Sequence, residues 1–288
     1  MTTDEIQKLI SKLCNEALPS LETECVIKNE YSGMLATDLF SLNTLLGSMI
    51  EQNVVLFLNN HRSLWDDKHK WEEYHFIRDK ESFPDVRLVK KNNRNETVLG
   101  IELKSWFILS KEGEPSFRFK TASEVCGEND LLCIVPWYLN NAVCGNPVLA
   151  KPWVIFAKTA AKAVKKYWSE DRNSSESERN VETPDIAKQP EINARNKTNY
   201  KPQKDHSNNF GRLARTRIMS KFVEDTLKTD ILGIPADNWR RFLKVHTDSK
   251  TLQDIQKNIA SIVKIPKSEE FERIIEDLQN YIKVLPKT

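Results

Sequence analysis

Apolar residues recur along the chain with two different spacings, which separate helical stretches from extended ones. Helical spacing over residues 6–17 and again over 41–60 predicts two helices, and Thr2 and Glu5 form a capping box before the first. Short apolar runs between polar turns indicate strands. The strands predicted in this way cover residues 85–90, 97–107, 131–139 and 147–156.

The first two of these strands belong together. An Asn-rich turn over residues 91–95 joins them, so the pair predicts a β-hairpin. The run 131–139 is apolar almost throughout, as expected of a strand that is buried on both faces. A helix is predicted over 157–168, directly after the fourth strand.

Composition divides the 288 residues into three parts. Residues 1–168 contain the predicted strands and are expected to form a core with N-terminal helices. Residues 169–209 contain few large apolar side chains and cannot bury enough surface to offset the entropy lost on ordering, so a polar mobile insertion or linker is expected. Helical spacing returns over 210–288, which predicts a helical C-terminal region.

The overall charge is nearly neutral, with 43 Lys and Arg against 41 Asp and Glu. Any basic surface must therefore come from local arrangement. The five cysteines are an odd number without a C-x-x-C pair, which argues against a disulfide framework or a zinc ribbon. No apolar run approaches the roughly 18 residues that span a bilayer. With no signal pattern at the N-terminus, a cytoplasmic location without membrane partners is expected.

One group of charged residues falls on the predicted hairpin. Glu102 and Lys104 are two apart on a strand and so point to the same face. Asp85 begins the preceding strand, and the hairpin can bring it beside Glu102. Two carboxylates suit Mg²⁺, and a neighbouring lysine can orient or deprotonate a metal-bound water or stabilise a phosphate. This set of groups predicts phosphodiester hydrolysis.

The chain contains its own controls for this pattern. Asp66-Asp67-Lys68 also reads acid-x-Lys but lies in no apolar strand, and no apolar strand follows Pro184-Asp185. Only the hairpin has both parts of the pattern in strand context. The alternative is a surface hairpin whose Glu and Lys form an ordinary ion pair.

The motif resembles the active site of the PD-(D/E)xK nuclease superfamily, and more narrowly that of type II restriction endonucleases, over about residues 41–168. The resemblance implies an α/β fold with a restriction-endonuclease-like mixed β-sheet core flanked by helices, in the order helix, three strands, helix, strand. It implies that Asp85, Glu102 and Lys104 are catalytic. It also implies that the two carboxylates and the Leu103 carbonyl bind Mg²⁺.

In that family, a helix before the motif often carries an acidic residue that faces the metal. Here Glu51 is the candidate for this additional metal ligand, and the alternative is an ordinary solvated helix residue. The family's last strand has no clear counterpart, because the predicted strand 147–156 precedes the helix instead of following it.

A nuclease must also bind a polyanion, and several basic or amide side chains are suitable. Arginine and lysine neutralise phosphates, whereas asparagine and arginine can read base edges. The candidates for DNA binding are Arg118, Lys120, Asn140, Asn141, Arg212, Arg215 and Arg217. The alternative for the last three is a solvated basic loop.

The resemblance implies a Mg²⁺-dependent endonuclease that cuts double-stranded DNA at a specific sequence. Cutting the two antiparallel strands of a symmetric DNA site suits a homodimer. The helical C-terminal region would serve dimerisation or DNA contact. A cognate DNA methyltransferase is expected as a separate protein. The alternatives are a structure-specific repair or mobile-element nuclease with the same core, and a non-catalytic nucleic-acid-binding protein.

Overall fold

The computed structural model describes residues 2–33, 42–79, 82–110, 113–115, 117–168, 211–245, 251 and 253. The helices are α1 (Thr3–Lys12), η1 (Leu13–Ala17), α2 (Leu21–Glu24), α4 (Leu42–Asn60), η2 (Arg62–Leu64), α5 (Ala157–Lys166), η6 (Leu213–Thr216), α7 (Ser220–Thr226) and α8 (Ala236–Val245). The strands are β1 (Tyr74–Arg78), β2 (Val86–Lys90), β3 (Asn93–Phe107), β4 (Leu131–Leu139), β5 (Pro147–Leu149), β6 (Trp153–Phe156), β7 (Asp230–Ile231) and β8 (Ile234–Pro235).

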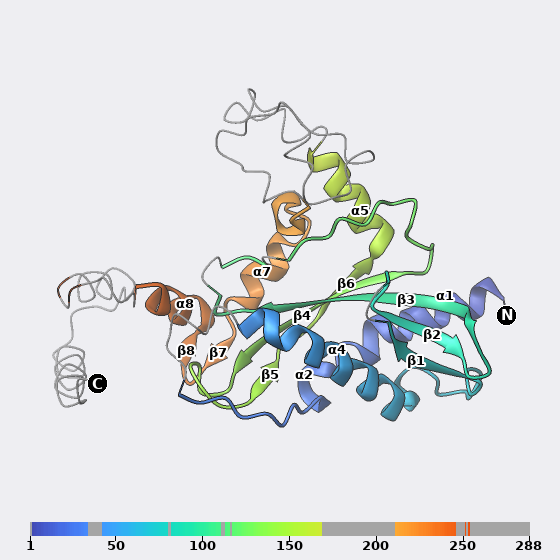
Figure 1. The fold of residues 1–288 in the computed structure, drawn as a ribbon, viewed down its shortest axis with the longest axis horizontal. Helices are drawn as coiled ribbons and strands as arrows, with labels where there is room; N and C mark the ends of the chain where they lie inside the picture. Colours follow the sequence, from blue (N-terminus) through green and yellow to red (C-terminus); the bar gives the residue numbers. More distant parts are fainter. Residues whose placement is uncertain are drawn as a thin grey trace.

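Six strands form one mixed sheet (Figure 1). β1, β2 and β3 are antiparallel neighbours, and β4 lies parallel to β3. β5 and β6 both pair antiparallel with β4, β5 near its C-terminal end and β6 near its N-terminal end. A mixed sheet flanked by helices was predicted, and the structure confirms this part of the fold class.

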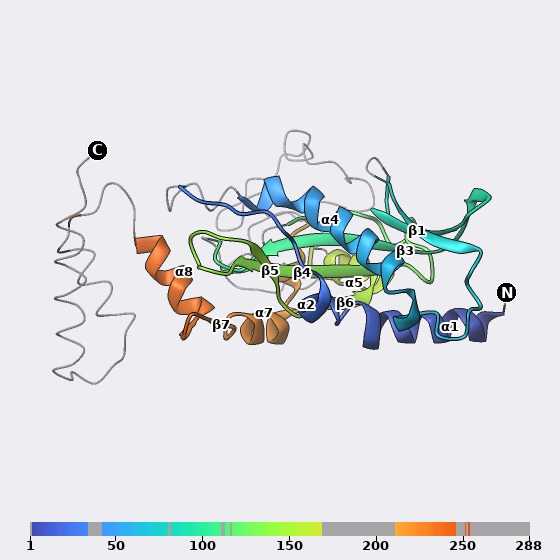
Figure 2. The same cartoon turned by 90° about the horizontal axis from the view of Figure 1, so that it is seen from below.

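Helices cover both faces of the sheet. Figure 2 shows α4 across one face, with α1 and α7 on the opposite side. Leu46, Ile50 and Val54 are four residues apart on α4 and are all buried, so they form the apolar stripe by which this helix packs. The structure thus confirms the helix predicted over 41–60.

The position of α4 defines the two faces of β3. A Cβ added to Gly47 of α4 would lie 3.3 Å from Ser105 Oγ, so the helix packs on the face that carries Ser105. Side chains alternate along a strand, which puts Leu103 on this same face. Glu102 and Lys104 therefore lie on the other face of β3.

The predicted hairpin is confirmed as β2 and β3, with Val86 opposite Ile101. The turn is shorter than predicted: it contains two residues, Lys91 and Asn92, because β3 begins at Asn93. The first predicted helix is also confirmed, as α1 followed by a π-helical turn. Its capping box is present, with both reciprocal hydrogen bonds between Thr2 and Glu5.

Two strand predictions need correction. β1 was missed, although Tyr74 and Phe76 alternate with less buried residues in it. The strand predicted over 147–156 is in fact two strands, β5 and β6, separated by residues 150–152. With β1 counted, β4 is the fourth strand along the chain and follows β3 through a connection whose described residues contain no helix.

The described part of the C-terminal region, residues 211–245, contains η6, α7 and α8 and is mainly helical, as predicted. It also contains the small β7–β8 hairpin, which was not predicted. The predicted insertion over 169–209 and the part of the predicted helical region from residue 254 onward lie outside the described residues. Within the described ranges, no helix is both long and apolar enough to cross a bilayer.

Candidate active site

The predicted catalytic residues converge where β2 begins. Pairing between β2 and β3 stops at Val86 and Ile101, and β3 continues beyond this point. Asp85 occupies the edge of β3 that is left open. The Leu103 amide donates a hydrogen bond to Asp85 Oδ2 at 2.9 Å, and the Asp85 amide donates to Glu102 Oε2 at 3.3 Å. The hairpin therefore brings Asp85 beside Glu102.

The Lys104 ammonium lies between the two carboxylates. Its Nζ atom is 2.5 Å from Glu102 Oε1 and 3.4 Å from Asp85 Oδ2. The side chains are only 22% exposed for Lys104, 10% for Glu102 and 20% for Asp85. Two carboxylates and one ammonium thus share a largely buried position, and carboxylate oxygens outnumber the one cation there.

Burial and neighbouring charges shift the pKa values of this group. Burial raises the pKa of Glu102, the charge of Asp85 raises it further, and Lys104 opposes the rise. For Lys104, burial acts to lower the pKa, but Glu102 and Asp85 together outweigh burial and raise it. Lys104 is therefore protonated at neutral pH. In this arrangement it can donate hydrogen bonds and stabilise negative charge.

The donor atoms fit a hard divalent cation. The N–H and C=O groups of one strand residue face the same edge, so the Leu103 carbonyl lies on the edge where its amide contacts Asp85. Asp85, Glu102 and this carbonyl offer oxygen ligands. Within the described residues, no three His, Cys, Asp or Glu side chains form a metal-binding group. Mg²⁺ suits such a partial set because it retains several waters.

Glu51 has a different partner. Nε and Nη2 of Arg78, on β1, donate hydrogen bonds to Glu51 Oε2 at 2.9 and 2.5 Å. Glu51 lies on α4, which packs on the Ser105 face of β3, whereas Lys104 lies on the other face. In the part of the chain that is described, the structure does not gather Glu51 into a cluster of three ligand side chains. Its role as a metal ligand stays a prediction.

Sequence reasoning missed two charged residues that border the site. Arg87 is two residues beyond Asp85, and this spacing places it on the same face of the hairpin. Arg87 Nη2 donates to Asp79 Oδ2 at 2.8 Å, and the Asp79 amide donates to the Asp85 carbonyl at 2.8 Å. The spacing of two along a strand was the sequence signal that could have identified Arg87.

Sequence reasoning also missed the contacts that position Pro84 before Asp85. A Cβ at Gly100 would lie 1.9 Å from Pro84 Cγ, so the proline packs directly on the glycine backbone. The Gly100 amide donates to Asp130 Oδ1 at 2.8 Å, and Asp130 Oδ2 accepts from Gly127 at 2.7 Å. A glycine inside a strand next to the motif was the available signal for this close approach.

Three of the predicted DNA-binding residues, Arg118, Lys120 and Arg212, come together, and we call them the basic segment. Arg118 and Arg212 form an isolated antiparallel bridge. Burial lowers the pKa of the neighbouring Lys120, and the charge of Arg118 lowers it further. The Lys120 ammonium is buried without a hydrogen-bond partner among the described residues. Arg215 and Arg217 follow Arg212 in the chain and are exposed.

An aromatic contact connects this basic segment to the catalytic motif. The ring centroids of Phe83 and Phe119 are 6.4 Å apart. Phe83 stands two residues before Asp85, and Phe119 lies between Arg118 and Lys120. The basic segment therefore adjoins the start of β2.

The predicted base readers after β4 lie far from the motif. Asn140 and Asn141 are exposed, and Asn140 Oδ1 accepts a hydrogen bond from the Asn146 amide at 3.0 Å. Leu132 of β4 lies opposite Glu102. Asn140 is eight residues farther along the chain, which corresponds to about 26 Å of strand. The structure does not bring these residues to the catalytic group.

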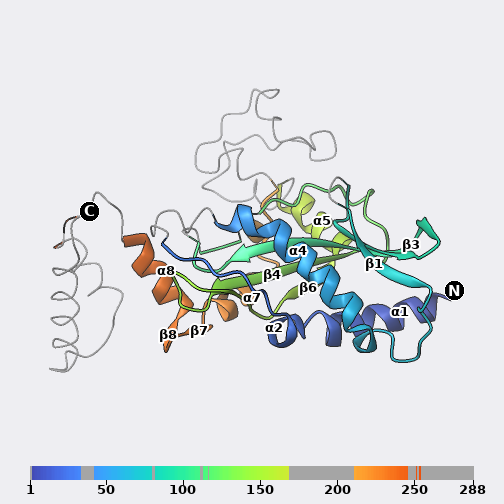
Figure 3. The ribbon, with the colours of Figure 1, turned by 60° about the horizontal axis from the view of Figure 1, so that its bottom comes forward.

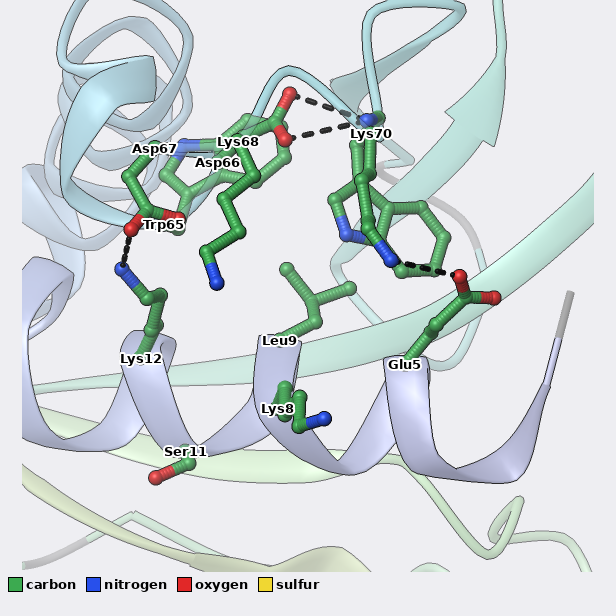
Figure 4. A pocket seen from close by; sticks show the side chains of 11 residues that line it. Glu5, Lys8, Leu9, Ser11, Lys12, Trp65, Asp66, Asp67, Lys68 and Lys70 are labelled. Atoms are coloured by element: carbon green, nitrogen blue, oxygen red, sulfur yellow. Dashed lines mark hydrogen bonds and ion pairs between the residues drawn. The ribbon is translucent and has the colours of Figure 1, made fainter.

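A separate cavity of about 280 Å³ lies between α1 and residues 65–71 (Figure 4). Lys12 Nζ is 2.7 Å from Asp67 Oδ2, and Lys70 Nζ is 3.0 Å from Glu5 Oε1. The lining contains both lysines and carboxylates, so neither sign of charge is concentrated in it. These ion pairs link α1 to the segment after η2, and we interpret the cavity as part of this packing contact.

Comparisons with protein-family models, with curated proteins and with solved structures found no match to this chain. Its function must therefore be argued from the site itself.

Proposed function

We propose that this protein is a Mg²⁺-dependent endonuclease of the type II restriction class, with a PD-(D/E)xK active site that hydrolyses double-stranded DNA at a specific sequence. The observation that carries the proposal is the Lys104 ammonium shared between Asp85 and Glu102. An ordinary surface ion pair would leave its carboxylate in solvent, whereas Glu102 is only 8% exposed. A chance match in sequence would not be expected to bring three residues of two strands together.

The order of the elements supports this class of nuclease. Helix α4 is followed by β1, β2 and β3 and then, after a connection, by β4. These elements correspond to the first helix, the three strands and the last strand of the order helix, three strands, helix, strand that is expected of a restriction-endonuclease-like core. The chain departs from that order between β3 and β4, where the described residues contain no helix.

The residues of the site have distinct tasks in this proposal. Asp85, Glu102 and the Leu103 carbonyl would hold Mg²⁺, which supplies positive charge near the phosphate and acidifies a bound water. Lys104 is protonated and would donate hydrogen bonds that orient the attacking water or a phosphate oxygen. The low exposure of these side chains strengthens their electrostatic effect.

The basic segment supplies the contact with DNA in this proposal. Arg118 and Arg212 would bind backbone phosphates close to the bond that is cut, which gives affinity without sequence information, and the buried Lys120 ammonium would add positive charge behind them. Cutting both strands of a symmetric site suits a homodimer. A separate cognate methyltransferase would protect the cell's own DNA.

Cleavage of plasmid and linear duplex DNA tests this function. We expect discrete fragments with Mg²⁺, no cleavage in EDTA, and no cleavage by Lys104→Ala. The matched control is Lys68→Ala, which alters the other acid-x-Lys sequence and should leave cleavage unchanged. Cleavage confined to forks or flaps would favour a structure-specific nuclease, and DNA binding without any cleavage would favour a non-catalytic protein.

A further inference from the structure

The turn end of the β2–β3 hairpin is basic and rich in asparagine. We define the hairpin tip as residues 91–95, with the sequence Lys-Asn-Asn-Arg-Asn, all of which are exposed. The three ribbon views show the hairpin at the end of the molecule opposite α8 (Figures 1, 2 and 3). The tip is thus separate from the active site, although the same two strands carry both.

The strands are irregular next to the tip. The register passes from Val89 opposite Thr97 to Lys90 opposite Asn93. Val89 and Lys90 are consecutive in β2, whereas their partners in β3 are separated by residues 94–96, which have no partner on β2. Bulges of this kind redirect side chains away from the regular faces of a sheet. Arg94 and Asn95 lie in the bulge and are exposed.

The charge of the tip is only partly compensated. Lys90 Nζ, just before the tip, is 3.6 Å from a carboxylate oxygen of Glu73 and 3.7 Å from one of Glu96. Lys91 and Arg94 form no ion pair with any described residue. Two exposed positive charges thus remain, and they complement the phosphates of a nucleic acid.

The side chains also have the chemistry that distinguishes bases. Arginine forms paired hydrogen bonds with guanine, and asparagine with adenine, in a major groove that admits a two-stranded β-ribbon. Asn93 Oδ1 accepts a hydrogen bond from the Asn95 amide at 3.2 Å, so Asn93 shapes the turn. The side chains of Asn92, Arg94 and Asn95 are left on the exposed surface.

We propose that the hairpin tip reads bases in the major groove of double-stranded DNA, with Arg94 and Asn95 as specificity-determining residues and Lys91 on a phosphate. The inference rests on the proposed function, because it places the tip on the same DNA that the active site cuts. Glu102 and Arg94 are eight residues apart on β3, up to about 26 Å. At 3.4 Å per nucleotide, the bases that are read lie within about eight base pairs of the cut.

The test uses the full chain and a library of duplexes with randomised sequence. Arg94→Lys keeps the charge but loses the paired hydrogen bonds, so it should retain DNA affinity and lose about 10-fold in sequence preference. Arg94→Ala with Asn95→Ala should lose about 10- to 100-fold in preference, together with footprint protection within about eight base pairs of the cut. The matched control is Lys28→Ala with Asn29→Ala, which removes an exposed cation and an exposed asparagine from another loop. This control should change neither the sequence preference nor the footprint.

Two outcomes separate the tip from the active site. If the parent cuts and the Arg94/Asn95 double variant retains its fragments and footprint, the tip is not the reader and the proposed function stands. If the parent cuts nothing in Mg²⁺, the proposed nuclease activity fails. Selection of bound duplexes in EDTA then tests the tip alone. If the parent selects particular sequences and the double variant does not, the result supports base reading by the tip. If the parent shows no sequence preference, the result overturns it.

Discussion

The main-chain amide of Leu103 donates a hydrogen bond to the carboxylate of Asp85 at 2.9 Å. This bond joins the Pro-Asp end of β2 to the acid-x-Lys strand through the backbone, so it does not depend on the side chain at position 103. Lys104 adds a second connection by contacting both Asp85 and Glu102. Residues that are 17 and 19 positions from Asp85 in the chain thereby share one site with it.

Replacement of Lys104 should destabilise the metal-free protein. In Lys104→Ala, the carboxylates of Asp85 and Glu102 would face each other without a cation in a largely buried position. We expect a loss of about 1–3 kcal/mol in the free energy of unfolding, measured by denaturant titration in EDTA. Saturating Mg²⁺ should restore more stability to this variant than to the parent, because the metal replaces the missing positive charge.

The exposed pair between Lys12 and Asp67 provides the control for that measurement. Its side chains are 28% and 46% exposed, so Lys12→Ala should cost less stability than Lys104→Ala and should not respond to Mg²⁺. Equal losses in the two variants, with no effect of metal, would contradict the account of Lys104.

A methyl group at Gly100 should disturb the active site through Pro84. The added Cβ would lie 1.9 Å from Pro84 Cγ, so the proline and the adjoining Asp85 must move. We expect Gly100→Ala to lose DNA cleavage and about 1–3 kcal/mol of stability. Gly47→Ala is the matched change, because its Cβ meets only Ser105 Oγ at 3.3 Å and alanine favours a helix. Wild-type cleavage by Gly100→Ala would show that Pro84 does not position Asp85.

The role of Glu51 can be tested through its ion pair with Arg78. Both side chains are less than a quarter exposed, so Glu51→Gln should lower the free energy of unfolding by about 1 kcal/mol. Because α4 packs on the face of β3 opposite Lys104, we expect the Mg²⁺ concentration for half-maximal cleavage to stay unchanged. A strongly raised Mg²⁺ requirement would instead support Glu51 as a metal ligand.

The basic segment should affect affinity evenly across DNA sequences. Arg118→Ala combined with Arg212→Ala should reduce the slope of log affinity against log salt by about 2, without altering the preferred sequence. Lys221→Ala removes an exposed cation of α7 and should leave the slope unchanged. Altered sequence preference in the double variant, with the same salt slope, would be inconsistent with phosphate contacts.

The hairpin could be predicted from the sequence because its information is local. Alternating apolar residues define β2 and β3, and an Asn-rich turn joins them. Strand alternation then places Glu102 and Lys104 on one face. The bulge beside the turn could not be predicted in the same way, because strand register depends on pairing geometry.

Other features depend on contacts between distant parts of the chain. β1 was missed because only Tyr74 and Phe76 mark its buried face. Asp130 supports β3 from 30 residues away, and this support is visible only once β3 and β4 are seen to be parallel neighbours. The pairing of Glu51 with Arg78 likewise requires α4 to be placed on the sheet.

The most direct test of the proposed nuclease site is the single-turnover rate of DNA cleavage in excess Mg²⁺ by the parent, by Asp85→Asn and by Asp67→Asn. The asparagine at position 85 can still accept the Leu103 hydrogen bond, so the fold should be retained while a charged metal ligand is lost. We predict that Asp85→Asn slows cleavage by at least about 100-fold, whereas Asp67→Asn keeps the parent rate. Cleavage by Asp85→Asn at the parent rate, or no Mg²⁺-dependent cleavage by the parent, would contradict the proposed site.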